Sequence, residues 1–150
     1  MLSSAFLFMH VLTMFTVVVI HSGPQILTLA AARTGQSGAV VGIASMYART
    51  GRAVPPLGIL GLLFGIATGL TGGFNLLAPW LLIAYALFGL LVVYGGVTSH
   101  PYIVGLGEAV HDERPNKEEL LGQRLTAIVA ADALIYVLII ADMVLKPFSS

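Results

Sequence analysis

Four long apolar runs follow one another along the chain, separated by shorter stretches that contain polar or turn-forming residues. The runs cover about residues 2–21, 53–70, 79–99 and 124–145. A helix needs about 20 residues to cross the roughly 30 Å hydrocarbon core of a membrane, and each run is close to that length. The pattern predicts an all-α integral membrane protein that forms one domain, a four-helix bundle.

The stretches between the runs predict two long connections at one end of the bundle and a short one at the other. Ser22-Gly23-Pro24 is expected to end the first helix, and His100-Pro101 the third, because proline disrupts helical hydrogen bonding. The long connections then cover residues 22–52 and 100–123. Pro24 is also suited to the first turn of a further helical piece.

Two segments bear on how the second helix is connected. Residues 39–49 place apolar side chains on one helical face. This favours either an interfacial helix or the lower part of a long second helix that is kinked at Pro55-Pro56. Residues 71–78 carry no charge, so we expect the second and third helices to form a tight hairpin.

The second apolar run also carries glycines at four-residue spacing. Gly61, Gly65 and Gly69 line one face of the predicted helix. In lipid, a strip of small residues lets a neighbouring helix approach closely, so the strip predicts a helix-packing surface of the glycine-zipper kind. The glycines follow no strand and precede no Lys-Ser/Thr pair, which excludes a phosphate-binding loop.

Basic residues near the helix ends predict the orientation in the membrane. Six of the seven lie in or beside the two long connections, and one lies at the opposite end of the bundle. By the positive-inside rule the long connections are cytoplasmic, both termini face outward, and the expected location is the inner membrane of a bacterial cell. The six are Arg33, Arg49, Arg52, Arg114, Lys117 and Arg124, and the seventh is Lys146.

Composition supports the membrane assignment and removes several classes of function. Hydrophobic residues make up 57% of the chain and charged residues 9%, against about 25% charged in soluble domains. The formal net charge is zero, so no overall basic surface indicates nucleic acid as a partner. The absence of cysteine excludes disulfides, thiol catalysis and thiolate metal sites. The expected partners are the bilayer and either other membrane subunits or further copies of the chain.

His10 is the first candidate for chemistry, because ionisable groups within a bilayer cost free energy and often have a function. Met14 lies one turn from it, and His21 lies about 16 Å deeper, within about 20° of the same helical direction. Imidazole is a good axial ligand for haem b, and thioether plus imidazole suits Cu(I). A second hypothesis is that His10 only hydrogen-bonds to a Ser, Thr or Asp of a neighbouring helix.

Three histidines are expected at the cytoplasmic level. His21 and His100 each end a helix that runs inward, and His111 lies in the following connection. Together with Arg49 or Arg52 they are candidates for binding a metal or the propionate side of a haem. A set of plain interfacial histidines is the alternative.

The fourth run contains two carboxylates. Asp132 is expected about 10 Å from the inner end of its helix, with Tyr136 one turn away as a hydrogen-bond partner. An aspartate at this depth needs a partner, and proton transfer is one function for such a group. A hydrogen bond that fixes the fourth helix to the first is the simpler role. Asp142 lies near the outer end, within reach of water or Lys146.

The order of these features resembles a known pattern. His10 comes early in the first helix, Arg52 precedes a proline-broken second helix, and Trp80 opens the third. This resembles uncharacterised four-helix bacterial membrane proteins that are loosely similar to CopD-type copper-resistance domains. It is more remotely similar to HemJ-type protoporphyrinogen oxidase, with Ala84 where that family carries a lysine. The resemblance implies a haem or copper connection and adds Trp80 to the candidate cofactor-binding residues.

Three functions follow as hypotheses. The first is a structural or accessory subunit of a larger membrane complex, such as a redox complex. The second is a b-type haem protein of electron transfer or haem metabolism, with His10 as axial ligand. The third is a copper-handling protein that uses His10 and Met14. No catalytic residue is assigned, and the sequence favours a role other than that of an enzyme.

Overall fold

The computed structural model of the protein describes residues 1–146, and within them the chain folds into four long helical rods. The first rod is the single helix α1 (Leu2–Arg33). The other three rods consist of several helical pieces joined end to end. The second rod contains α2 (Ser37–Thr50), the 3₁₀ turn η1 (Gly51–Ala53) and α3 (Val54–Gly72). The third rod contains α4 (Pro79–Tyr94), the π-helical turn η2 (Gly95–Ser99) and α5 (His100–His111). The fourth rod contains α6 (Lys117–Glu119), the π-helical turn η3 (Leu120–Arg124) and α7 (Leu125–Leu145).

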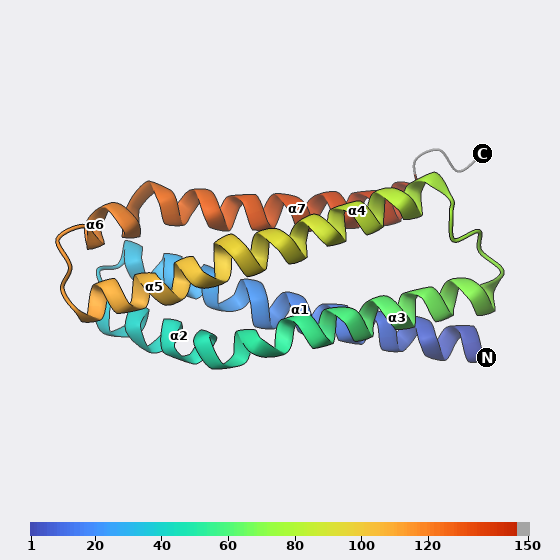
Figure 1. The fold of residues 1–150 in the computed structure, drawn as a ribbon, viewed down its shortest axis with the longest axis horizontal. Helices are drawn as coiled ribbons and strands as arrows, with labels where there is room; N and C mark the ends of the chain where they lie inside the picture. The colour runs from blue at the N-terminus through green and yellow to red at the C-terminus, as the bar shows by residue number, and fades with distance from the viewer. Residues whose placement is uncertain (147–150) are drawn as a thin grey trace.

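The rods run up and down, so both described ends of the chain lie at the same end of the bundle (Figure 1). Helix α1 packs along α3 and α2, α4 packs along α7, and α2 packs along α5. The pair α3 and α4, although joined by residues 73–78, is not among the closely packed pairs. The expected tight hairpin of the second and third helices is therefore wrong, because each of these helices packs against another neighbour instead.

Two predicted helix ends are also wrong. Helix α1 continues through the buried residue Pro24 to Arg33. The third rod passes His100-Pro101 and continues to His111. Neighbouring helices re-satisfy the groups that a proline frees inside a membrane bundle, so proline is tolerated there. Pro101 also falls in the first turn of α5, directly after the π-helical turn, where a missing N–H costs little.

The connections shrink accordingly to residues 34–36, 73–78 and 112–116. Residues 22–52 and 100–123 are mostly helix rather than loop. Of the two alternatives for residues 39–49, the structure has the long second helix. Its winding changes to a 3₁₀ turn just before Pro55-Pro56. The fourth rod begins at Lys117, ahead of the expected start at residue 124, and kinks at Gly122, where φ is −86° and ψ is −120°.

The surface and the core divide the bundle into two halves. Around residues 1–20, 54–94 and 126–145 many large apolar side chains are exposed, and in a membrane they face lipid. The four rods are 29 to 36 residues long and apolar enough to cross a membrane, which gives an all-α, multi-pass membrane bundle. A cluster of buried hydrophobic residues lies in the other half, farthest from the termini, and consists of Ala31, Val40, Ala44, Tyr47, Ile103, Leu106, Val110 and Leu125.

Candidate functional site

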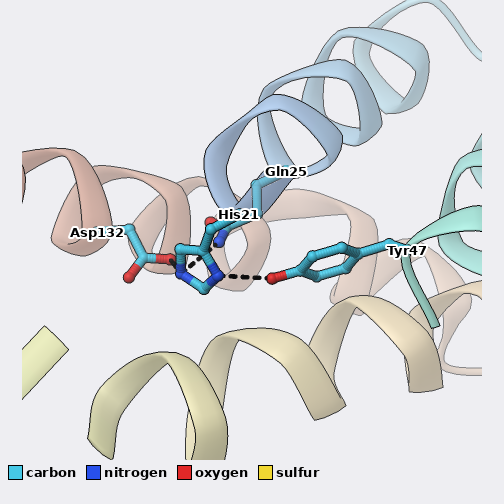
Figure 2. Close-up of polar contacts among 4 residues, drawn as sticks. All are labelled: His21, Gln25, Tyr47 and Asp132. Atoms are coloured by element: carbon cyan, nitrogen blue, oxygen red, sulfur yellow. Dashed lines mark hydrogen bonds and ion pairs between the residues drawn. The ribbon is translucent and has the colours of Figure 1, made fainter. Parts of the chain in front are cut away.

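Four buried polar side chains meet where the two halves of the bundle join. They are His21 and Gln25 of α1, Tyr47 of α2 and Asp132 of α7 (Figure 2). Their exposed fractions are 4%, 1%, 0% and 1%. Burying this many polar groups in an otherwise apolar bundle costs free energy unless they satisfy one another. We call these four residues the polar cluster.

His21 is the centre of the polar cluster because both of its ring nitrogens are engaged. Its Nδ1 lies 2.7 Å from the Tyr47 hydroxyl oxygen. Its Nε2 lies 3.1 Å from the amide nitrogen of Gln25 and 3.4 Å from Oδ2 of Asp132. The contact with Asp132 is an ion-pair distance rather than a hydrogen bond, since neither carboxylate oxygen has a hydrogen-bond partner among the described residues.

This geometry accommodates a proton in more than one place. With the Gln25 amide donating to Nε2, the ring carries its proton on Nδ1 and donates it to Tyr47, whose own hydroxyl hydrogen is then free to point elsewhere. If the Gln25 amide turns to present its oxygen, Nε2 can take a proton as well. The resulting imidazolium then lies 3.4 Å from the Asp132 carboxylate, which stabilises its charge.

Two glycines make room for the imidazole rings. A Cβ on Gly95, in the turn η2, would lie 2.9 Å from Cε1 of His21. A Cβ on Gly51, in the turn η1, would lie 2.5 Å from Cδ2 of His100. Both turns interrupt the regular α-helical winding at this level, and π-helical turns are frequent at functional sites. The backbone is thus adapted to hold two histidines close to it.

Beside the polar cluster lies a cavity of about 250 Å³. Its polar wall is formed by His21, Tyr47, His100 and Tyr136, and Arg52 lies at its edge with an exposed side chain. The Nε2 of His100 and the hydroxyl of Tyr136 are buried and have no hydrogen-bond partner among residues 1–146. The rest of the lining is apolar or glycine: Val17, Gly51, Val54, Pro55, Gly58, Phe88, Leu91, Val92, Gly95 and Gly96.

The structure brings together some of the sequence-predicted site residues. His21, His100 and Arg52 line the same cavity, as the sequence suggested for one level of the bundle, whereas His111 does not line it. With both nitrogens of His21 in contacts inside the protein, neither is left for a metal or haem in this arrangement. The buried Nε2 of His100 is the imidazole nitrogen that remains available at the cavity.

His10 lies apart from the cavity, against the glycine strip of α3. Its Nδ1 donates a hydrogen bond of 2.7 Å to the carbonyl oxygen of Gly61, a backbone acceptor rather than the expected Ser, Thr or Asp. The absence of a Cβ at Gly65 permits this, because one there would lie 2.9 Å from Nδ1. Met14 fills the space at Gly61 in the same way, and Leu76 the space at Gly69. Two of the three strip positions thus receive side chains of α1.

Two further predictions concern Tyr136 and Trp80. The expected hydrogen bond between Tyr136 and Asp132 is absent, since Oδ2 of Asp132 lies 3.4 Å from His21 and the Tyr136 hydroxyl makes no hydrogen bond within residues 1–146. Trp80 lies at the amino-terminal end of α4, where the ammonium group of Lys146 is 5.5 Å from its ring centroid. His10, Arg52 and Trp80 therefore lie at three different levels and do not form one site.

Gln25 and Tyr47 are the members of the polar cluster that the sequence analysis did not single out. Both stand in segments that the sequence assigned outside the crossings, where polar residues are ordinary. The sequence does contain one indication of the contact with Gln25. If the first helix is continued through Pro24, Gln25 lies one turn after His21 on the same helical face. Tyr47 belongs to a helical face that was recognised as apolar, and its burial follows from that face.

Neither a metal-binding group within the described residues nor a similar known protein indicates a function for this chain. Within residues 1–146, no group of three or more His, Asp or Glu side chains is arranged to hold a metal ion. Comparisons of the chain with protein-family models, curated proteins and solved structures find no match. Functional inference therefore rests on the polar cluster, the cavity and His10.

Proposed function

We propose that this membrane protein binds the headgroup of a quinone-type ligand in the 250 Å³ cavity and exchanges protons with it through Tyr47, His21 and Asp132. One observation carries the proposal: a continuous set of contacts runs from a buried carboxylate through an imidazole to a tyrosine hydroxyl, and the tyrosine lines an apolar cavity. Intramembrane Asp and His in contact are characteristic of proton relays.

The lining favours this class of ligand. Apolar walls suit a ring that arrives through lipid, and a few convergent polar groups suit its carbonyl oxygens. His100 and Tyr136 supply polar atoms that have no partner within the described chain. A buried polar group without a partner costs free energy, so a ligand that pairs with these atoms binds favourably.

The chemistry requires protons at this place. A quinone that takes up two electrons becomes a dianion unless two protons bind its oxygens, and charge is costly in an apolar cavity. In each passage Tyr47 donates a proton to a carbonyl oxygen and takes one from His21, and His21 is reprotonated from bulk water by way of Asp132. Two passages deliver the two protons. The electrons come from a redox protein of the membrane, so the chain acts as the quinone-binding accessory subunit of a redox complex.

A stability measurement tests binding. We expect a short-chain naphthoquinone to raise the unfolding temperature of the detergent-solubilised protein in a concentration-dependent way, because a ligand that binds the folded state stabilises it. Tyr136→Phe removes an unpartnered cavity hydroxyl and should weaken this stabilisation. Tyr85→Phe, on α4 but outside the cavity lining, is the matched control. The proposal is contradicted if the naphthoquinone stabilises all three proteins equally, or if it does not stabilise the wild type.

A second candidate function, haem b binding at His10, is favoured by one observation. Histidines that ligate metals usually donate their other ring N–H to a carbonyl or carboxylate, and His10 donates Nδ1–H to Gly61. This leaves Nε2 with its lone pair for iron or copper. Protein expressed with ample haem should then show a Soret band that His10→Ala abolishes and His111→Ala preserves. A flat spectrum from folded protein would remove this candidate, and copper analysis would follow.

A further inference from the structure

A groove on the surface of the half of the bundle farthest from the termini has the features of a second binding site, and it shares Arg52 with the lining of the cavity. It lies between α2 and α5 and has a volume of about 510 Å³. Small residues form its floor: at Gly107 even a Cβ would collide with the Cβ of Ala44, so the helices approach closely there. Its lining includes Val41, Ala44, Arg49, Arg52, Val104 and Glu108.

The charges of the groove are unbalanced. Arg49 and Arg52 are both exposed, one turn apart, and the side chain of neither makes an ion pair or hydrogen bond with any of residues 1–146. His111 adds a third basic group at the far end, and Glu108 is the one acid in the lining. Two unpaired guanidinium groups beside an apolar trough attract an anion that has an apolar part.

The position of the groove along the bundle identifies the source of such an anion. Arg52 stands where the second rod becomes purely apolar, at Val54, and Arg49 lies about 4.5 Å farther from that run. The headgroup layer extends roughly 5–8 Å beyond the hydrocarbon core. Both arginines therefore lie at the depth of lipid phosphates if the apolar runs fill the core.

We infer that this groove binds an anionic phospholipid. Its phosphate pairs with Arg49 and Arg52, one acyl chain lies against the apolar residues Val41, Ala44 and Val104, and hydroxyl groups of a glycerol headgroup donate to Glu108. Basic pockets between membrane helices are a general mode of anionic-lipid recognition. The inference does not depend on the proposed quinone site.

Native mass spectrometry of the detergent-purified chain tests this, with phosphatidylglycerol and phosphatidylcholine of matched acyl chains as probes. We expect phosphatidylglycerol to be retained preferentially, and Arg49→Gln to weaken its binding roughly tenfold, as for the loss of one charge-assisted contact. Arg33→Gln, at the end of α1 and outside the groove lining, is the matched control and should bind as the wild type does.

Three outcomes would overturn the inference. Equal retention of the two lipids means that the arginines recognise no phosphate charge. Equal loss in Arg49→Gln and Arg33→Gln means that only overall charge matters. Displacement of phosphatidylglycerol by millimolar inorganic phosphate means that the groove binds a free anion rather than a lipid. Because Arg49 does not line the cavity of the polar cluster, quinone binding in Arg49→Gln stays intact and separates the two proposals.

Discussion

At the scale of single residues, His21 makes the contacts that hold the polar cluster together. Its two nitrogens contact side chains from three helices, so one imidazole joins α1, α2 and α7. A buried ion pair adds little net stability over apolar replacements, yet loss of one partner leaves the other charge uncompensated. Removing one partner of the His21–Asp132 contact should therefore lower the stability of the protein more than the contact itself adds to it.

A double-mutant cycle tests this coupling. His21→Leu leaves Asp132 buried without a partner, and we expect it to lower the free energy of unfolding by about 3–5 kcal/mol. Asp132→Leu should also destabilise, but the double variant should lose clearly less than the sum of the two. Unfolding in mixed micelles measures all three. The exposed His111→Leu is the control, with an expected change within about 0.5 kcal/mol, and strict additivity would argue against the contact.

At the scale of secondary-structure elements, the sequence predicted the apolar parts of the helices correctly and was wrong about the helix ends that lie farthest from the termini. Pro24 and Pro101 were interpreted as helix ends because proline breaks helices in water. Inside this bundle α1 runs through Pro24, and Pro101 opens α5 after a π-helical turn. Such compensation depends on neighbouring helices, which a pattern along one segment does not contain.

The turn η2 offers a matched pair of glycines for a test. Gly95 faces His21 at 2.9 Å from a would-be Cβ, whereas nothing lies within 4 Å of one at Gly96. We expect Gly95→Ala to cost about 1–3 kcal/mol, as for overpacking, and to shift the ¹⁵N imidazole signals of His21. Gly96→Ala should leave those signals in place. Identical spectra for the two variants would mean that η2 does not position the imidazole.

At the scale of the whole molecule, composition and apolar run length were sufficient for the fold class. The four-helix membrane bundle follows from runs of about 20 residues and few charges, and it is confirmed. The polar cluster was only partly predictable. His21 and Asp132 were each singled out as unusual, but their pairing depends on how α1 and α7 are set against each other, and no period within one helix encodes that.

The orientation in the membrane is a prediction of the same scale. The positive-inside rule puts both termini outside. The chain has no cysteine, so single cysteines can be introduced without a background. In intact cells, a membrane-impermeant thiol reagent should label Ser4→Cys near the amino terminus and should reach Ser37→Cys, at the start of α2, only after permeabilisation. The reverse pattern would invert the topology.

The central claim is that Tyr47, His21 and Asp132 exchange protons with a quinone bound in the cavity. The most direct measurement is the infrared difference spectrum for electrochemical reduction of a naphthoquinone bound to the reconstituted protein. We expect a carboxyl band that disappears in Asp132→Asn and weakens in Tyr47→Phe. The band should persist in Asp112→Asn, because the Asp112 carboxylate is exposed and pairs with Arg114. A spectrum unchanged by Asp132→Asn would show that Asp132 exchanges no proton with the quinone.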